Sequence, residues 1–477
     1  MTHAEKKVII IDKKHLTPPF NIALKENGEA FKCTEILRIV PGKRAVLLGE
    51  WQKKSVIVKL FYRRFKATGH FHREVEGNHH FKKANIPTAK ILHKGSAGDY
   101  RAKMLIFDYI YPSKNLDTLL RSCKDREIRW KHLQKLIILV AKMHGAGLQH
   151  HDLHLENFLV KDNVLYAIDG SALEVKDKNH ALDTQTSLKN LATLFAQRGL
   201  EKNSFFKELF FLYCTTREFK DKTKHLALLQ RMVKNERKFR IKRYLKKIYR
   251  QSTETVCIKG FTSFLLCKRS NYTPAMAKFL EDPDSAFNNP ETVMLKNGNS
   301  STVVRFKING QDLVIKRYNI KNPVHALKRA FQKTRAHGSW YAAHLLLEYG
   351  INTPAPIAMK EVRLGPFKSR AYLICDYIEG LSARDYFKDF LPKSDTHLPQ
   401  KILGIFKKLE SLQISHGDMK ATNIIVHYGT PFLIDLDSMV QHRSKICFAR
   451  ARNKDVKRFM KNWAEKPEIA TIFHPLK

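Results

Sequence analysis

The chain of 477 residues is too long for one ordinary hydrophobic core, and its length predicts two domains. Hydrophobic residues make up 43% and aromatic residues 10%, which is normal for globular protein and excludes wholesale disorder. The 86 Lys and Arg residues against 45 Asp and Glu residues leave a net charge of +41, which favours a polyanionic partner: nucleic acid, an anionic membrane surface or a phosphorylated glycolipid.

Cysteine usage and the hydrophobic runs indicate the compartment. The seven cysteines form no CxxC pair, which argues against a zinc site and a disulfide framework and fits a reducing environment. Residues 1–14 are too polar, with too short an apolar run, for a signal peptide, and no apolar stretch approaches the length needed to span a bilayer. We therefore expect a cytoplasmic protein that attaches to a membrane only peripherally.

The first strand with a chemical signal is the alternating segment 56–61, which carries Lys59. A helical segment follows it and contains two carboxylates, Glu74 and Glu76. Counting back from the turn at 85–89 favours Glu74 as the carboxylate that orients Lys59, with Glu76 as the alternative. A strand at 105–110 follows and contains an acidic residue.

A loop with the pattern H-x-D-x4-N comes next, at residues 150–157. It contains Asp152 and Asn157, and a second aspartate, Asp169, follows the asparagine by 12 residues on a predicted strand. The five-residue spacing lets both loop side chains face one site. One such match could arise by chance, so the pattern is informative only if the second half of the chain repeats it.

Residues 217–250 are strongly basic, with 14 Lys or Arg residues against three acidic ones. Ile241, Leu245 and Ile248 recur at helical spacing, so the segment is predicted to be a basic amphipathic helix. Either it packs on its own lobe with a solvated basic side, or it contacts anionic lipid. We place the first domain at 1–255, a linker leading into the second domain at 256–290, where Asp-Pro and Asn-Pro turn signals occur, and the second domain at 291–477.

The second half repeats the first. A strand at 313–318 carries Lys316, a turn lies at 350–354, and a strand at 373–378 again contains an acidic residue. The loop pattern returns as Asp418 and Asn423, followed by Asp435. All three lie 266 residues after their counterparts.

Two parts of the pattern depart from expectation. The second copy has Gly338-Ser-Trp-Tyr in place of the helix carboxylate, so its lysine is either oriented differently or binds nucleotide poorly. Neither residues 40–44 nor residues 296–302 contain a GxGxxG loop, although the second segment could present backbone N–H groups to phosphate from a Gly- and Ser-rich turn.

These residue types suit phosphoryl transfer, which depends on positioning and charge neutralisation. A strand lysine holds the ATP phosphates, a loop aspartate takes the proton of an acceptor hydroxyl, and an asparagine and a second aspartate ligate Mg²⁺. The candidate catalytic residues are Asp152 and Asp418. The candidate ATP-binding residues are Lys59, Glu74 and Lys316, and the candidate metal ligands are Asn157, Asp169, Asn423 and Asp435. The order of elements predicts an α+β fold of two tandem protein-kinase-like domains, each with a small β-rich N-lobe and a helical C-lobe.

At these residues the chain resembles the bacterial lipopolysaccharide core kinases, the heptose and Kdo kinases with a protein-kinase-like fold. The resemblance is sharper in the second half, and the matching segments are 295–303, 313–319, 335–340, 350–354 and 416–423, together with the basic run at 240–250. It implies ATP-dependent phosphorylation of a heptose or Kdo hydroxyl at the cytoplasmic face of a Gram-negative inner membrane. The implied partners are the core glycolipid and the anionic membrane surface.

Other functions remain open at this point. A protein Ser/Thr kinase is the enzymatic alternative, but neither half contains an Ala-Pro-Glu sequence, and only 42 residues follow Asp435. A pseudokinase scaffold with one or both sites inactive is the second alternative, since fold does not establish activity. Specific nucleic-acid binding rests on charge alone and is not expected. The pattern does not indicate an oligomeric state.

Overall fold

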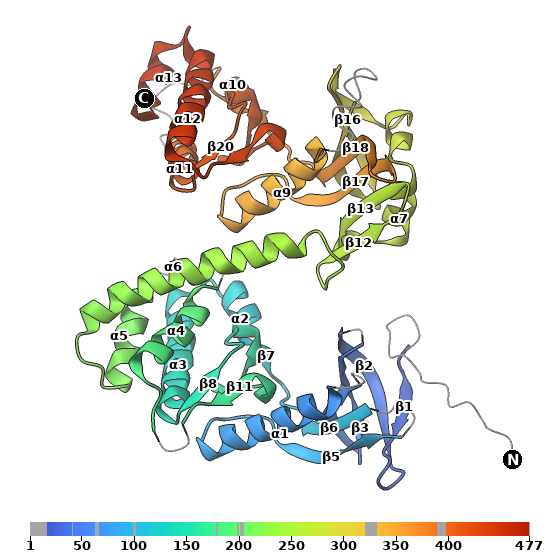
Figure 1. Ribbon diagram of the computed structural model, residues 1–477, viewed down its shortest axis with the longest axis vertical. Coiled ribbons are helices and arrows are strands. Elements are labelled where there is room, and N and C mark those ends of the chain that lie inside the picture. Colours follow the sequence, from blue (N-terminus) through green and yellow to red (C-terminus); the bar gives the residue numbers. More distant parts are fainter. Residues whose placement is uncertain are drawn as a thin grey trace, which may run out of the picture. The chain divides into compact units, whose positions relative to one another are not determined.

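The computed structural model describes residues 17–476 except 41, 63–65, 99–101, 178–179, 198–199, 201–204, 320–331 and 389–396. The N-terminal segment 1–14 discussed above therefore lies outside the described residues. The chain forms two compact units, Met1–Lys238 and Phe239–Lys477. Each unit combines a mainly antiparallel sheet with a mainly helical part (Figure 1), so the predicted α+β, two-lobed architecture is confirmed.

The N-lobe of the first unit is a six-stranded antiparallel sheet in the order β1-β2-β3-β4-β6-β5. Strand β4 carries Lys59 and lies between β3 and β6, with Val56, Val58 and Leu60 buried on one face. Helix α1 (Ala67–Lys83) packs on the other face through Phe71. The strands are β1 (Phe20–Ala23), β2 (Ala30–Val40), β3 (Arg44–Trp51), β4 (Lys54–Phe61), β5 (Ile91–Ala97) and β6 (Ala102–Asp108).

The C-lobe of the first unit is helical, with short strands that present the loop residues. Asn115 and Asp125 cap helices α2 and α3, each accepting two backbone N–H bonds at the helix start. The helices are α2 (Leu116–Ser122), α3 (Arg126–Gly145), α4 (Thr184–Phe195) and α5 (Phe206–Thr216). The short strands are β7 (Lys114–Asn115), β8 (Leu148–His150), β9 (Phe158–Lys161), β10 (Val164–Ala167) and β11 (Leu173–Val175).

The N-lobe of the second unit is a seven-stranded sheet in the order β12-β13-β17-β18-β16-β15-β14. The five strands from β17 to β14 repeat the order of β5-β6-β4-β3-β2 in the first unit, and β12 and β13 add a hairpin beside β17. Helix α7 (Pro274–Glu281) covers part of one face through Met276 and Leu280. The strands are β12 (Thr255–Lys259), β13 (Ser263–Lys268), β14 (Val293–Gly298), β15 (Ser301–Ile308), β16 (Gln311–Tyr318), β17 (Pro356–Leu364) and β18 (Phe367–Asp376).

Helix α9 (Arg335–Glu348) lies between β16 and β17 in the chain, and the C-lobe of the second unit follows β18. Trp340 of α9 is buried in the same core as Ile402 of α11 and Phe459 of α12. The further helices are α10 (Ala383–Tyr386), α11 (His397–Ser411), α12 (Lys445–Met460) and α13 (Pro467–Ile472). The short strands are β19 (Leu381–Ser382), β20 (Ile414–Ser415), β21 (Ile424–His427), β22 (Thr430–Leu433) and β23 (Val440–Gln441).

The structure places the boundary between the units earlier than the sequence interpretation did, at 238/239 instead of 255/256. Residues 256–290, read as a linker, instead form β12, β13 and α7 and supply core side chains such as Leu265 and Met276. The Asp-Pro turn at 282–283 begins a short 3-10 helix that packs on the sheet through Ala286. Turn signals of this kind mark a change of chain direction and do not distinguish a linker from a compact edge of a domain.

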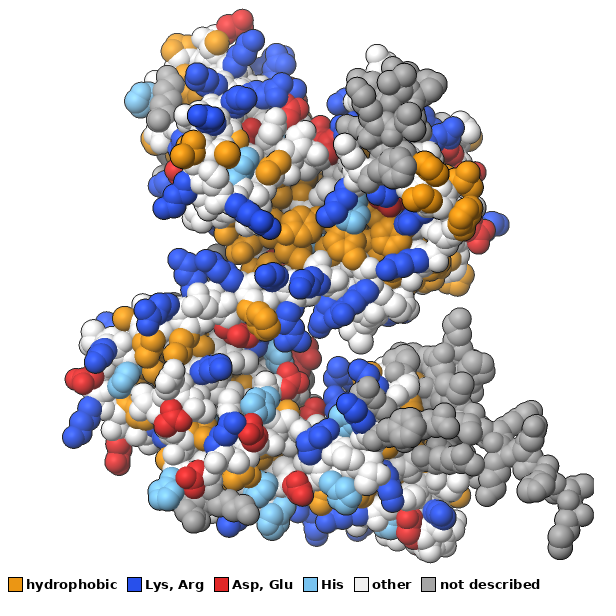
Figure 2. Space-filling model, in the orientation of Figure 1, with side chains coloured by type: hydrophobic (Ala, Val, Ile, Leu, Met, Phe, Trp, Pro, Cys, Tyr) orange, Lys and Arg blue, Asp and Glu red, His pale blue; other side chains and the backbone are white. Residues whose placement is uncertain are grey.

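Helix α6 (Lys222–Lys247) explains the position of the boundary. Its Leu229 and Val233 are buried in the core of the first unit, whereas Ile241 and Leu245, with Ile248 just beyond the helix, are buried in the core of the second. The predicted apolar stripe is therefore used for packing inside the protein, and its basic side chains lie on the surface along the helix (Figure 2). The stripe residues Ile241, Leu245 and Ile248 therefore pack in the second unit and not on the lobe of the first domain, and a lipid contact of the basic side stays a prediction. None of the helices in the described part of the chain has the length and hydrophobicity that crossing a bilayer requires.

Candidate active sites

The strand lysine of the first unit is held by the predicted helix carboxylate. Lys59 Nζ lies 2.6 Å from Glu74 Oε1, and Glu74 is buried on α1. The other carboxylate oxygen of Glu74 accepts a bond of 3.2 Å from the backbone N–H of Ser171. Burial raises the pKa of Glu74, although Lys59 opposes this effect. The structure thus brings Lys59 and Glu74 together and selects Glu74 over Glu76.

The second aspartate, Asp169, lies at the same place. It has a left-handed backbone, with φ of 66°, and its side chain accepts a bond of 2.7 Å from Ser171 Oγ. Arg44 of β3 lies 3.6 Å from its other oxygen. Burial alone would raise the pKa of Asp169, but Lys59 and Arg44 hold it well below its usual range, so the group is an anion suited to a cation.

The loop at 150–157 holds its two polar residues close together. Asn157 Nδ2 donates to the backbone oxygen of Asp152 at 2.7 Å, and His154 Nε2 lies 3.0 Å from Asp152 Oδ1. The hydrogen bond with His154 lowers the pKa of Asp152. Beneath the loop, Asn190 donates to the backbone oxygen of His150 at 2.9 Å and is itself bonded to the buried ring of His144. His144 therefore supports the loop and takes no place in the site.

The second unit holds its lysine by a different arrangement. Lys316 is paired directly with Asp435, and its Nζ also lies 3.6 Å from Asp437 Oδ1. Arg335, at the start of α9, is paired with the other oxygen of Asp437, which is almost completely buried. Burial alone would raise the pKa of Asp435, but Asp437 and Lys316 hold it well below its usual range. A carboxylate two residues beyond Asp435 thus takes the place of the missing helix carboxylate.

The segment of α9 that stands in place of the helix carboxylate makes a different contact. Ser339, in the Gly338-Ser-Trp-Tyr segment, is hydrogen-bonded through Oγ to the hydroxyl of Tyr318 at 3.0 Å. Of the two expectations for this lysine, the geometry agrees with a different orientation. Asp437 and Arg335 were missed by sequence reasoning. The sequence signal that could have identified Asp437 is the second carboxylate in Asp435-Leu-Asp437, where the first copy has Asp169-Gly-Ser171.

The catalytic-loop aspartate of the second unit has more contacts than its counterpart. Asp418 Oδ1 lies 3.1 Å from Lys420 and 3.0 Å from Arg458 of α12. Its side chain is 26% exposed, against 55% for Asp152. Asn423 Nδ2 donates to the backbone oxygen of Asp418 at 2.8 Å, which repeats the loop geometry of the first unit. Buried Asp455 accepts the backbone N–H groups of residues 416 and 417, which anchors the loop to α12.

Each unit has a cavity beside its lysine. The cavity of the first unit has a volume of about 260 Å³ and is lined by Lys59, Glu74 and Asp169. The cavity of the second unit is larger, about 590 Å³, and includes Lys316, Asn423 and Asp435. Asp108–Ile110 and Asp376–Ile378 contribute one wall each, and Leu37 and Leu295 lie among the apolar side chains. Asn157, Asp152 and Asp418 are not among the lining residues.

The turn between β14 and β15 approaches the second cavity, since Lys296 and Val303 line it. Arg335 donates to the backbone oxygen of Ser300 at 3.2 Å, and Asn319 donates to that of Gly298 at 3.2 Å. These two bonds anchor the turn at residues 298 and 300, within the Gly- and Ser-rich segment 296–302 whose Lys296 lines the cavity. In the first unit, residue 41 of the corresponding segment 40–44 lies outside the described residues.

The predicted metal ligands suit magnesium. An aspartate carboxylate and an asparagine amide oxygen are hard donors of the kind Mg²⁺ prefers, and it usually binds through one or two protein groups together with phosphates and water. No cluster of three or more His, Cys, Asp or Glu side chains with metal-binding geometry occurs among the described residues. The donor sets Asn157/Asp169 and Asn423/Asp435 therefore fit a nucleotide-bound Mg²⁺ better than a permanently held ion.

Comparison with known proteins agrees with this geometry. The family model described as the lipopolysaccharide kinase (Kdo/WaaP) family matches residues 44–197 and 285–471. The two matched regions contain all nine predicted site residues and lie one in each half of the chain. A search of curated proteins finds no match.

Proposed function

Because this chain belongs to the lipopolysaccharide kinase (Kdo/WaaP) family, and is therefore a phosphotransferase that uses ATP, we propose that it phosphorylates a heptose or Kdo hydroxyl of the inner core. We further propose that it does so at the cytoplasmic face of the inner membrane. The observation that carries the proposal is the second cavity, where Lys316, Asn423 and Asp435 meet in a space of about 590 Å³. This arrangement supplies the charges that phosphoryl transfer needs.

In the proposed reaction the second unit binds ATP with its base near Asp376–Ile378 and its phosphates near Lys316. Mg²⁺, bound through Asn423 and Asp435, would neutralise the phosphate charge. Asp418 accepts the proton of the sugar hydroxyl while the hydroxyl oxygen attacks the γ-phosphorus and ADP leaves. Lys420 and Arg458 orient the Asp418 carboxylate.

In the first unit the corresponding roles fall to Asp152, Lys59 and Glu74, with Asn157 and Asp169 as the metal ligands. Its smaller cavity and the contact between Arg44 and Asp169 mean that nucleotide binding there requires Arg44 to exchange its partner for phosphate. Both units are proposed to bind ATP and Mg²⁺.

The test of the proposed function is mass analysis of lipopolysaccharide core from a strain lacking this protein. We expect the core to lose one phosphate, and the loss to be restored by the wild-type chain. A strain that produces the Asp152→Ala/Asp418→Ala double variant serves as the control, because it contains the protein but should not transfer phosphate. A core of unchanged mass in the deletion strain would refute the choice of acceptor.

Metal dependence follows from the paired asparagine and aspartate ligands. We expect purified protein to consume ATP with Mg²⁺ or Mn²⁺ and to stop when excess chelator is added, because the phosphate charge is then left unneutralised. Restoring Mg²⁺ should restore the rate. ATP turnover that continues at full rate in excess chelator would contradict the assignment of Asn157, Asp169, Asn423 and Asp435.

A further inference from the structure

Two hairpins of the second unit place apolar side chains in solvent. The β12–β13 hairpin presents Phe261, which is 70% exposed, and the β17–β18 hairpin presents Leu364 and Phe367, which are 62% and 47% exposed. Ile258 adds a fourth side chain at 45%. Scattered exposed hydrophobic residues need no explanation, but several gathered on adjacent turns indicate a contact surface.

The two turns lie side by side at one end of the sheet. Gly365 N donates to the backbone oxygen of Phe261 at 2.9 Å, and Arg363 N donates to that of Thr262 at 2.9 Å. A Cβ atom on Gly365 would come within 3.2 Å of the Phe261 ring, so the ring lies over this glycine, whose φ is 57°. Leu364 and Phe367 are cross-strand partners on either side of the turn. The exposed side chains therefore form one surface, which we call the hairpin surface.

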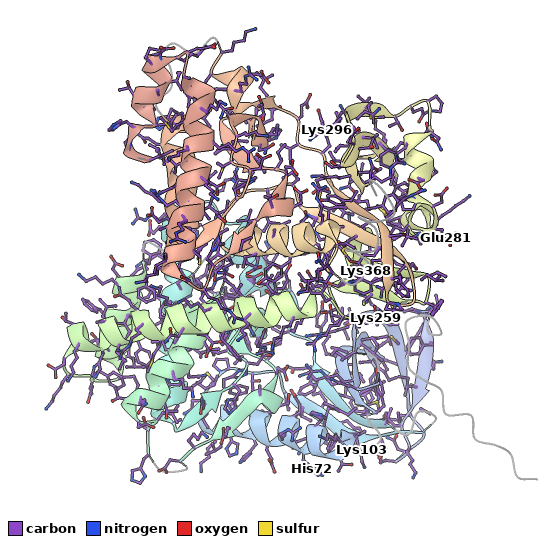
Figure 3. All side chains as sticks on the ribbon, turned by 45° about the horizontal axis from the view of Figure 1, so that its top comes forward. His72, Lys103, Lys259, Glu281, Lys296 and Lys368 are labelled. Carbon is purple, nitrogen blue, oxygen red and sulfur yellow. The ribbon has the colours of Figure 1, made fainter. Side chains whose placement is uncertain are left out.

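The charged side chains of the two turns are all basic: Lys259, Arg363, Lys368 and Arg370. Arg363 lies 3.5 Å from Glu361 and Arg370 lies 2.7 Å from Asp284, so Lys259 and Lys368 carry the positive charge that the surface offers to a partner. In Figure 3, Lys259 and Lys368 lie toward the same end of the sheet, away from Lys296. Lys259 is exposed, and Lys368 donates to the backbone oxygen of Gln332, a neutral acceptor, at 2.8 Å.

We propose that the hairpin surface is the membrane contact of this protein and that it binds anionic phospholipid. Exposed aromatic side chains flanked by Lys and Arg are the combination that binds at the boundary between headgroups and acyl chains. A second copy related by two-fold symmetry would bring identical basic turns together, which like-charge repulsion disfavours. A nucleic acid would match the charge but not the projecting apolar side chains.

The hairpin surface differs from helix α6, the other candidate for a lipid contact. The apolar stripe of α6 is buried in the two cores, and its described residues present one large hydrophobic side chain to solvent, Phe239, which is 54% exposed. The hairpin surface instead gathers four exposed apolar side chains beside exposed charge. This inference rests on the proposed function, because an acceptor embedded in the membrane is what gives the kinase a reason to bind there.

The test is co-sedimentation of the full-length protein with vesicles. Vesicles of phosphatidylglycerol and phosphatidylethanolamine should sediment the wild type, and pure phosphatidylcholine should not. We expect Phe261→Ser with Phe367→Ser to weaken binding at least about tenfold, because the apolar contact is lost. Lys259→Gln with Lys368→Gln should weaken it by about fivefold for each lysine.

The matched control is Lys278→Gln with Lys307→Gln, which removes two exposed charges from the same lobe. It should change vesicle binding by less than the Lys259/Lys368 pair. Equal loss in both pairs would show that only net charge matters and would overturn the assignment, as would wild-type binding by the Phe261/Phe367 variant. A changed sedimentation coefficient or a lowered melting temperature in that variant would instead assign the surface to a second copy or to packing within the chain.

The vesicle result is independent of the proposed reaction. ATP turnover of each variant should equal that of the wild type, since none of these residues lines either active-site cavity. If vesicles bind as expected but the core of the deletion strain keeps its phosphate, the membrane surface stands and the proposed acceptor fails. If the core loses phosphate but vesicles do not bind, the membrane surface fails and the acceptor stands.

Discussion

Alanine at Asp418 is expected to lower phosphoryl transfer by roughly 10²–10⁴, the usual effect of losing a general base. The reason is that Asp418 is the acidic side chain of the second unit that can take the proton from the acceptor hydroxyl. Steady-state transfer to purified core glycolipid, measured with the full-length chain, gives the size of the loss. The binding of ATP should change little, because Asp418 does not line the cavity that holds Lys316.

Asp152→Ala is the matched variant in the first unit. The helix carboxylate, which only the first copy has, would by itself favour the larger loss for this variant. Asp437 removes that distinction, and Asp418 is both less exposed than Asp152 and held by two basic side chains. We therefore now expect Asp418→Ala to cost at least as much as Asp152→Ala. Transfer that survives Asp418→Ala intact and disappears in Asp152→Ala would assign turnover to the first unit alone.

Asp437→Ala is expected to lower both the stability of the second unit and its activity. The change removes a carboxylate that is only 4% exposed and leaves Arg335 without this partner. Breaking a buried ion pair costs about 3–5 kcal/mol, but Arg335 is 26% exposed and Lys316 keeps Asp435, so we expect about 2–3 kcal/mol. For a unit of this size the melting temperature should fall by about 5–10 °C, measured by calorimetry.

The activity loss in Asp437→Ala has a separate cause. Without Asp437, the remaining carboxylate paired with Lys316 among the described residues is Asp435, the proposed metal ligand, and this competition should weaken metal binding. The half-saturating Mg²⁺ concentration should therefore rise. The matched control is Ser171→Ala in the first unit, which occupies the corresponding position and loses one hydrogen bond to Asp169, worth about 1 kcal/mol. Equal stability losses in the two variants would mean that Asp437 carries no buried ion pair.

The residues of the catalytic loops could be predicted because they are close in sequence. Asp152 and Asn157 share one short loop, and the bond from Asn157 Nδ2 to the Asp152 backbone is a local contact. The lysine strand and the helix carboxylate Glu74 were predictable for a related reason, since they belong to consecutive elements with a fixed order. The exact repeat of these spacings in the second half made the fold identifiable.

The pairing of Arg335 with Asp437 could not be predicted in the same way. The two residues are 102 positions apart, and their contact depends on how α9 packs against the turn after β22. The missing helix carboxylate showed that something had to compensate for it, but not which residue. Only the tertiary structure shows that α9 and the turn after β22 are in contact.

The unit boundary in the structure differs from that of the sequence interpretation because periodicity shows that a helix face is buried without showing what buries it. The stripe containing Ile241 and Leu245 is equally compatible with a lipid surface and with a protein core. For residues 256–290, the apolar run at 264–267 was the signal for a strand, although the turn residues at 282–290 are equally typical of a linker.

Helix α6 has a consequence for how the two halves can be separated in evolution or by experiment. Duplicated domains joined by a flexible tether can be shuffled, lost or exchanged one at a time, because each keeps its own core. Here a cut anywhere within Lys222–Lys247 divides one helix, and a cut after it removes Ile241 and Leu245 from the second core. Because both halves use this helix, we expect them to be inherited together. A mutation that inactivates one half leaves this helix whole, whereas a deletion of either half divides it or shortens it.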